Sequence, residues 1–184
     1  MKGVYTVIGA LASLITQTQA NSDIISLYTN GATWIQEASA TLILPPLPNP
    51  VSGDVAIWSA IMMETRLPSS KGSRRTPRLD KLNPTSQLWD QNVYVNGKLV
   101  SSVSTSKGQH GDIFYVSIEC ASGNCAAHPA HTWQDISIVL NKADTSFKKS
   151  GNWAFGATGG QMSTPDAGKT WNFTTLNIPS QKAE

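Results

Sequence analysis

The sequence predicts an all-β protein built as an antiparallel two-sheet β-sandwich or jelly roll. Three observations predict this class. Hydrophobicity alternates with period two along most of the chain, and no amphipathic helix stands out. Turn-forming pairs that contain glycine recur between the apolar runs. Charged residues make up only 14% of the 184 residues, as is common in extracellular β-rich domains, and this length supports one domain with its own core.

About eight strands are expected. The clearest is the hairpin 91–100, where Asn96-Gly97 favours a type I′ turn because both central residues need positive φ. The nearly continuous apolar run 54–63 predicts a strand buried on both faces. The prolines of 45–50 end the strand before it, since proline cannot donate to a ladder. The remaining expected strands span 24–28, 34–44, 113–120, 132–140, 152–157 and 170–178.

The first 20 residues predict a secretory signal peptide, followed by a single β-sandwich domain over residues 21–184. Lys2 supplies the positive start, Val4 to Ile15 the apolar stretch, and Thr18 and Ala20 the small residues before the cleavage site. A membrane anchor is the alternative, but the apolar run is shorter than the roughly 20 residues that a spanning helix needs. We therefore expect a secreted, extracellular protein with no membrane attachment after signal removal.

If the protein is secreted, a disulfide and an N-glycosylation site become expected features. Cys120 and Cys125 would enter an oxidising path, so we expect a disulfide between them. Asn172-Phe173-Thr174 is an N-glycosylation sequon.

The net charge of +2 gives no reason to expect a nucleic-acid partner.

A basic stretch interrupts the β pattern at about residues 64–86 and predicts an irregular insertion. It holds six of the chain's 14 Lys and Arg residues, three prolines and few periodic apolar residues. A structureless loop of this length is unusual in a compact domain. Three interpretations stay open: a binding loop for an acidic polysaccharide or a phosphate, a surface insertion without function, or native strand sequence replaced through an error of gene prediction.

The pattern from Trp34 to Trp58 resembles fungal secreted proteins with a concanavalin A-like sandwich. The matching segments are Trp34-Ile35, residues 40–48 and Gly53 to Trp58, and the likeness continues through 93–103, Glu119 to Cys125 and 136–140. The resemblance covers most of the chain after residue 20, apart from the basic stretch, and implies the same fold.

The same layout is distantly similar to the glutamic peptidases, the eqolisins. Those enzymes hold a Gln and a Glu side by side on one sheet, where the Glu acts on a water and the Gln positions it. The Gln expected soon after the strand 55–60 is absent here, and the chain continues with Glu64-Thr65-Arg66. On the strand 132–140 the nearest polar residues are Gln134 and Asp135, which makes Gln134 a weak catalytic candidate.

Carboxylates are the other candidates for catalysis, because a sandwich that hydrolyses sugars usually needs two of them. No two acids stand at two-residue spacing after residue 20. Glu119 is the most interesting of them, since it ends a β-run and precedes the disulfide; the alternative is a solvated residue at a strand end. Catalysis would require a raised pKa and a partner.

Metal and cofactor chemistry has little support in the sequence. His128 and His131 form an H-x-x-H pair, but Pro129 disfavours a helix and no third ligand is indicated. No glycine-rich phosphate loop and no G-x-S-x-G motif occur. We expect no metal and no cofactor, and read the histidines as polar loop residues.

The six tryptophans suggest a sugar-binding surface, because exposed aromatic rings serve as stacking platforms. Trp34, Trp58 and Trp171 have apolar neighbours and are predicted in the core. Trp89 and Trp133 have polar neighbours and are the predicted ligand-binding rings.

The function predicted first is a carbohydrate-interacting secreted protein that binds or processes cell-wall glycans, with a polysaccharide or glycan as its partner. The alternatives are an eqolisin-like peptidase or an inactive relative of one, and a non-catalytic surface or effector protein. Whether the protein is an enzyme stays open; if it is one, the patterns indicate a hydrolase. The default ligand site of such a sandwich is its concave sheet.

Overall fold

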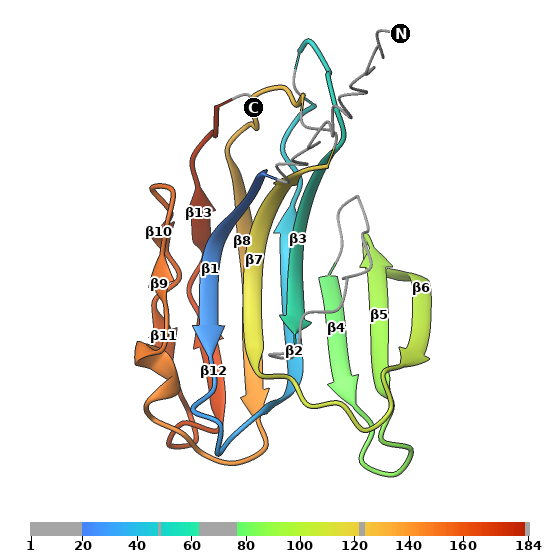
Figure 1. The fold of residues 1–184 in the computed structure, drawn as a ribbon, viewed down its shortest axis with the longest axis vertical. Coiled ribbons are helices and arrows are strands. Elements are labelled where there is room, and N and C mark those ends of the chain that lie inside the picture. Colours follow the sequence, from blue (N-terminus) through green and yellow to red (C-terminus); the bar gives the residue numbers. More distant parts are fainter. Residues whose placement is uncertain (1–19, 48, 63–76, 122–123, 183–184) are drawn as a thin grey trace, which may run out of the picture.

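The computed structural model describes residues 20–47, 49–62, 77–121 and 124–182. Two antiparallel sheets pack face to face as a sandwich, which confirms the predicted all-β class. Figure 1 shows the small sheet in front of the large one, and the large sheet extends past it on the side of β4, β5 and β6. No helix within these residues is long and apolar enough to cross a membrane. The predicted signal peptide and its cleavage site at residues 1–20 lie almost entirely outside the described residues.

The small sheet has four strands in the order β3-β7-β1-β9. Strand β7 (Ile113–Cys120) is central and pairs along its whole length with both β1 (Ala20–Tyr28) and β3 (Val55–Met62). The two-residue strand β9 (Asn152–Trp153) extends the sheet beyond β1. The predicted strands 24–28, 54–63 and 113–120 are therefore neighbours although they are distant in sequence.

The large sheet has nine strands, seven of them along the path β10-β13-β8-β2-β4-β5-β6. Strand β12 pairs with β8 and β11 beside that path, and one 3-10 turn, η1, precedes β9. The elements are β2 (Ile35–Ile43), β4 (Pro77–Leu82), β5 (Trp89–Val95), β6 (Lys98–Thr105), β8 (His131–Leu140), η1 (Phe147–Lys149), β10 (Thr158–Gly159), β11 (Met162–Ser163), β12 (Thr170–Phe173) and β13 (Leu176–Ile178).

The core lies between the two sheets and is built by alternation. On β7 the side chains of Phe114, Val116 and Ile118 point into it, and on β8 those of Ile136 and Ile138 do. These residues are buried almost completely. Such burial contributes roughly 1.5–3 kcal/mol for each large apolar side chain. The packing leaves one face of each sheet pointing away from the core.

Several local predictions are confirmed. Asn96 and Gly97 both have positive φ, at 50° and 76°, and join β5 to β6 as the sequence predicts. The disulfide joins Cys120 and Cys125. The predicted strand 170–178 is instead two strands, β12 and β13, which pair with different parts of β8. The break falls opposite an irregular stretch of β8 around Asp135, where no regular ladder can continue.

The expectation of an irregular segment over 64–86 is wrong in part. Pro77–Leu82 forms β4, which is inserted between β2 and β5. The sequence did not predict this strand because several of its side chains are charged. One of them, Lys81, makes an ion pair of 2.8 Å with Glu37 on β2. The turn that follows is closed by Asn83, whose side-chain oxygen accepts from the backbone N–H groups of Thr85 and Ser86. Residues 63–76, with most of the basic side chains, lie outside the described residues.

Candidate functional site

The side of the small sheet that points away from the core carries a group of polar and aromatic side chains. We call it the small-sheet face and define it by Asp23, Tyr28, Trp58, Tyr115, Ser117 and Glu119. Strand β7 supplies three of these by alternation, because Phe114, Val116 and Ile118 occupy the core side. The face therefore follows from the period-two pattern of one central strand.

A β-bulge on β1 brings Asp23 to this face. The pairing with β7 shifts between Asp23 and Ile25, so one extra residue is inserted and both Ile24 and Ile25 are buried in the core. Asp23 lies opposite Ser117, whose hydroxyl donates a hydrogen bond of 2.6 Å to the carboxylate. Bulges commonly re-aim side chains next to functional sites.

Strand β3 completes the row. Trp58 lies opposite Ser117 on the other side of β7, so Asp23, Ser117 and Trp58 form one row across three strands. Trp58 is half-buried, and among the described residues its indole Nε1 is buried without a hydrogen-bond partner. Trp58 was predicted in the core, and this prediction is wrong because Ile57 on the same strand takes the core side.

Glu119 lies one row further along β7, between Ala56 and the backbone of Asn21. Only 7% of the residue is exposed, so the carboxylate is recessed among its neighbours, where it has interactions of its own. Asp23 is its diagonal neighbour on β1, and such neighbours lie roughly 7–8 Å apart in an antiparallel pair. The weak candidate Glu119 therefore does have a second carboxylate nearby on the same face, which the sequence could not show.

The end of β7 at Glu119 is held in place by its covalent and backbone contacts. Cys120 is bonded to Cys125 directly after it. The N–H of Ala121 donates to the carbonyl of Asp54 at 2.8 Å, and the N–H of Ala126 donates to Ser52 at 3.0 Å. These contacts join the disulfide loop to the segment that enters β3, so Glu119 sits on a supported strand end.

The opposite end of the small-sheet face is aromatic. Tyr28 and Tyr115 contact each other edge to face, with ring centroids 6.4 Å apart and an angle of 81°. Tyr28 is 42% exposed. Together with Trp58, these rings border the polar row on the face.

The two tryptophans predicted to bind ligand are buried instead. Trp133 is 3% exposed and packs in the core, and Trp89 is 6% exposed and donates from Nε1 to the carbonyl of Gln109 at 2.9 Å. Neither ring offers a face for stacking. Their polar neighbours in sequence point to the opposite side of the strand, which is why the rings themselves point inward.

The outer side of the large sheet holds the other candidate, Gln134. The pairing of β8 with β2 shifts between Ser39 and Thr41, and Asp135 has a positive φ of 51°. Gln134 and Asp135 are both exposed, while Trp133 and Ile136 on either side of them are buried. This bulge therefore turns an amide and a carboxylate outward at consecutive positions.

Asn172 also lies on the outer side of the large sheet, exposed, opposite Ser137 of β8. Its flanking residues Trp171 and Phe173 point into the core. The position is thus accessible to glycosylation, and a glycan there would occupy the large sheet and leave the small-sheet face free.

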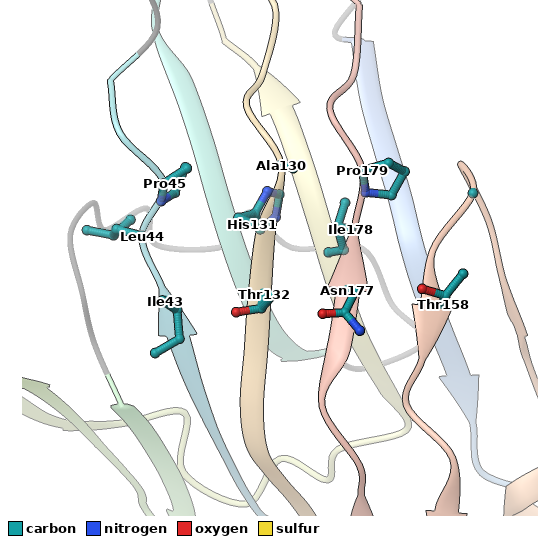
Figure 2. A pocket seen from close by; sticks show the side chains of 11 residues that line it. Ile43, Leu44, Pro45, Ala130, His131, Thr132, Thr158, Asn177, Ile178 and Pro179 are labelled. Atoms are coloured by element: carbon teal, nitrogen blue, oxygen red, sulfur yellow. The ribbon is translucent and has the colours of Figure 1, made fainter.

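An open groove of about 540 Å³ lies on the outer side of the large sheet. Figure 2 shows its floor, a row of side chains from four adjacent strands, and the ladders pair them in the order Ile43, Thr132, Asn177 and Thr158. Leu44, Pro45 and Pro179 also line it. The floor carries hydroxyl and amide groups, and the lining also includes His131, whose side chain is buried.

The two histidines of the H-x-x-H pair lie near this groove and are buried, not solvated loop residues. His131 lies on β8 opposite Ile178, and the backbone of His128 exchanges two hydrogen bonds of 3.0 Å with Gln181. Burial lowers the pKa of both rings, and for His131 the neighbouring His128 lowers it further. Nε2 of His131 is buried without a hydrogen-bond partner.

Comparison with known proteins leaves the family open. The chain matches no protein-family model, no curated protein and no solved structure. The resemblance to fungal concanavalin A-like proteins and to the glutamic peptidases remains a prediction from the sequence.

Proposed function

We propose that this is a secreted carbohydrate-interacting protein whose small-sheet face binds or processes a cell-wall glycan. One observation carries the proposal: aromatic rings and carboxylates gather on the same face of a four-stranded sheet. Trp58, Tyr28 and Tyr115 supply the rings, and Asp23 and Glu119 supply the carboxylates.

This combination suits sugars for a physical reason. The flat apolar face of a pyranose packs on an aromatic ring, and rings give large contact area at low entropy cost. The sugar hydroxyls need hydrogen-bond acceptors, and ionised carboxylates accept without competing donors. A sheet holds both kinds of group at spacings of several ångströms, which allows one chain of sugars to meet them in turn.

The same face supports processing as well as binding. The backbones of diagonal neighbours such as Asp23 and Glu119 lie roughly 7–8 Å apart, which leaves room for the separation of about 6.5–9.5 Å that inverting glycosidases keep between their two carboxyl groups. In that case one carboxyl group would protonate the leaving oxygen while the other activates a water. Hydrolysis would thus follow from the same two residues that bind.

The test is a binding assay with the protein secreted by a eukaryotic host. Insoluble cell-wall glycans are incubated with the wild-type protein and with Trp58→Ala and Tyr28→Ala. We expect each variant to lose affinity by about tenfold, since aromatic contacts contribute on the order of 1–2 kcal/mol. Tyr94→Ala on β5 is the matched control and should bind as the wild type does. Absence of binding to every glycan would overturn the proposal.

A second candidate function is an eqolisin-like peptidase, and the bulge on β8 favours it. That bulge exposes Gln134 and Asp135 side by side, and an amide beside a carboxylate is the pair that the resemblance implies. The prediction is proteolysis at acid pH that inhibitors of serine, cysteine and metal peptidases leave unchanged. Asp135→Asn should abolish it, whereas Asp90→Asn on β5 should not. Wild-type protein without acid proteolysis would exclude this candidate, and failure of both assays would leave a non-catalytic surface protein.

A further inference from the structure

The small sheet carries acidic side chains without any basic side chain on the same strands. The strands of the small sheet, β1, β3, β7 and β9, contain two carboxylates, Asp23 and Glu119, and no Lys or Arg. Their formal charge is therefore 0 − 2 = −2. The strands of the large sheet mix both signs: they carry Arg78, Lys81 and Lys98 together with Glu37, Asp80, Asp90 and Asp135, which gives 3 − 4 = −1. The small-sheet face therefore differs in having carboxylates with no basic side chain on the same strands.

The aromatic rings on this face favour the same sign of ligand charge. A cation above the face of a Trp or Tyr ring is attracted by the ring quadrupole. Trp58 is in the same row as Asp23, and Tyr115 lies two residues from Ser117 on the same side of β7. A protonated amine on this face would meet rings and carboxylates together.

An anionic ligand would meet the opposite situation. Glu119 is recessed, with only 7% exposed, and has interactions of its own, so an incoming negative group would add a like charge beside a carboxylate that is already partly desolvated. Like charges placed together in a partly desolvated site are costly. No Lys or Arg stands on these four strands to compensate an acidic sugar.

We propose that the ligand of the small-sheet face is a cationic glycan, a polymer of amino sugars whose amines are free and protonated. Asp23 and Glu119 accept hydrogen bonds from the ammonium groups, and Trp58 and Tyr28 pack against the sugar rings. The inference rests on the proposed function, to which it adds the class of glycan. It separates glucosamine polymers from neutral glucans and from uronic acid polymers.

The experiment compares four polysaccharides at mildly acidic pH: deacetylated chitin, fully acetylated chitin, a neutral β-glucan and polygalacturonate. The secreted wild-type protein should bind deacetylated chitin at least about tenfold more tightly than the others, because hydrogen bonds between charged groups are stronger than those between neutral groups. Salt should weaken this binding by screening. Asp23→Asn and Glu119→Gln should each reduce it by about tenfold.

Matched controls keep the result interpretable. Asp23→Asn retains an acceptor for the Ser117 hydroxyl, so the variant should fold. Asp90→Asn removes a carboxylate of the large sheet, which accepts from Ser104, and should leave binding unchanged. If Asp90→Asn weakens binding as much as Asp23→Asn does, the effect is one of net charge and the inference fails.

The remaining outcomes separate the two proposals. Equal affinity for neutral and cationic glycans, still lost in Trp58→Ala, would overturn the cationic ligand and leave the carbohydrate function standing. Preference for polygalacturonate would overturn the cationic ligand too. Binding to none of the four polysaccharides would overturn the carbohydrate function itself.

Discussion

At the scale of single residues, the tryptophans show how strand alternation overrides local composition. Trp133 stands between Thr132 and Gln134 and is buried, whereas Trp58 stands between Ile57 and Ser59 and lies on the outer side of its sheet. Neighbours in a strand point to the opposite side, so polar neighbours indicate an inward ring. The predictions for Trp58 and Trp133 are both wrong because the sequence neighbours of each ring lie on the other side of the strand and do not surround the ring.

The two rings should therefore differ in what their loss costs. Trp133→Ala removes a large side chain from the core and should lower the free energy of unfolding by about 3–5 kcal/mol. Trp58→Ala should cost clearly less, because part of that ring is already in water. Denaturant unfolding of both variants measures the difference. Equal losses would contradict the assignment of Trp133 to the core and Trp58 to the small-sheet face.

At the scale of elements, two β-bulges decide which polar groups reach a surface. The bulge on β1 buries Ile24 and Ile25 in sequence and aims Asp23 at Ser117. The bulge on β8 exposes Gln134 and Asp135 in sequence. Each bulge breaks the period-two pattern for one residue, and predictions of strand faces that rely on this pattern fail at such positions. Both candidate sites depend on these breaks.

Strand β4 illustrates the same limit for a whole element. Its sequence Pro77–Leu82 has charges at alternate and adjacent positions and resembled a continuation of the basic stretch. Pairing with β2 and β5 and the contact of Lys81 with Glu37 make it a strand. These partners lie far away in the chain, and local propensity does not contain them.

At the scale of the whole molecule, the two sheets offer different surfaces. The small sheet combines rings with carboxylates, while the large sheet carries charges of both signs, the open groove and the sequon Asn172. A glycan on Asn172 and a ligand on the small-sheet face would therefore occupy opposite sides of the sandwich. The combination of aromatic rings and carboxylates without a basic side chain on the same four strands is what points to a cationic ligand.

The pH dependence of stability also belongs to the whole fold. Burial lowers the pKa of His128 and His131 below the usual 6.5, so the unfolded chain binds protons more readily than the native protein as the pH falls below 6.5. The free energy of unfolding should fall over that range and level off below the native pKa values. Urea unfolding between pH 7.5 and 4.5 measures it.

The carboxyl group of Asp144 titrates at lower pH than the two histidines. Burial alone would raise the pKa of Asp144, but hydrogen bonds from Ser146 and Thr33 hold it below 3.8, so its contribution is lost only at lower pH. The control is His131→Phe with His128→Phe, which should flatten the slope between pH 6.5 and 4.5. An unchanged slope in that double variant would contradict the prediction.

The β class, the Asn96-Gly97 hairpin and the disulfide between Cys120 and Cys125 could be predicted from the sequence, because each depends on residues within a few positions of one another. Glu119 was a candidate on the same basis. That Asp23, Ser117 and Trp58 share a row, and that Trp89 and Trp133 lie inside, became visible in the folded structure. The physical reason is that alternation is local, whereas the register between strands and the choice of buried face are set by long-range pairing and core packing.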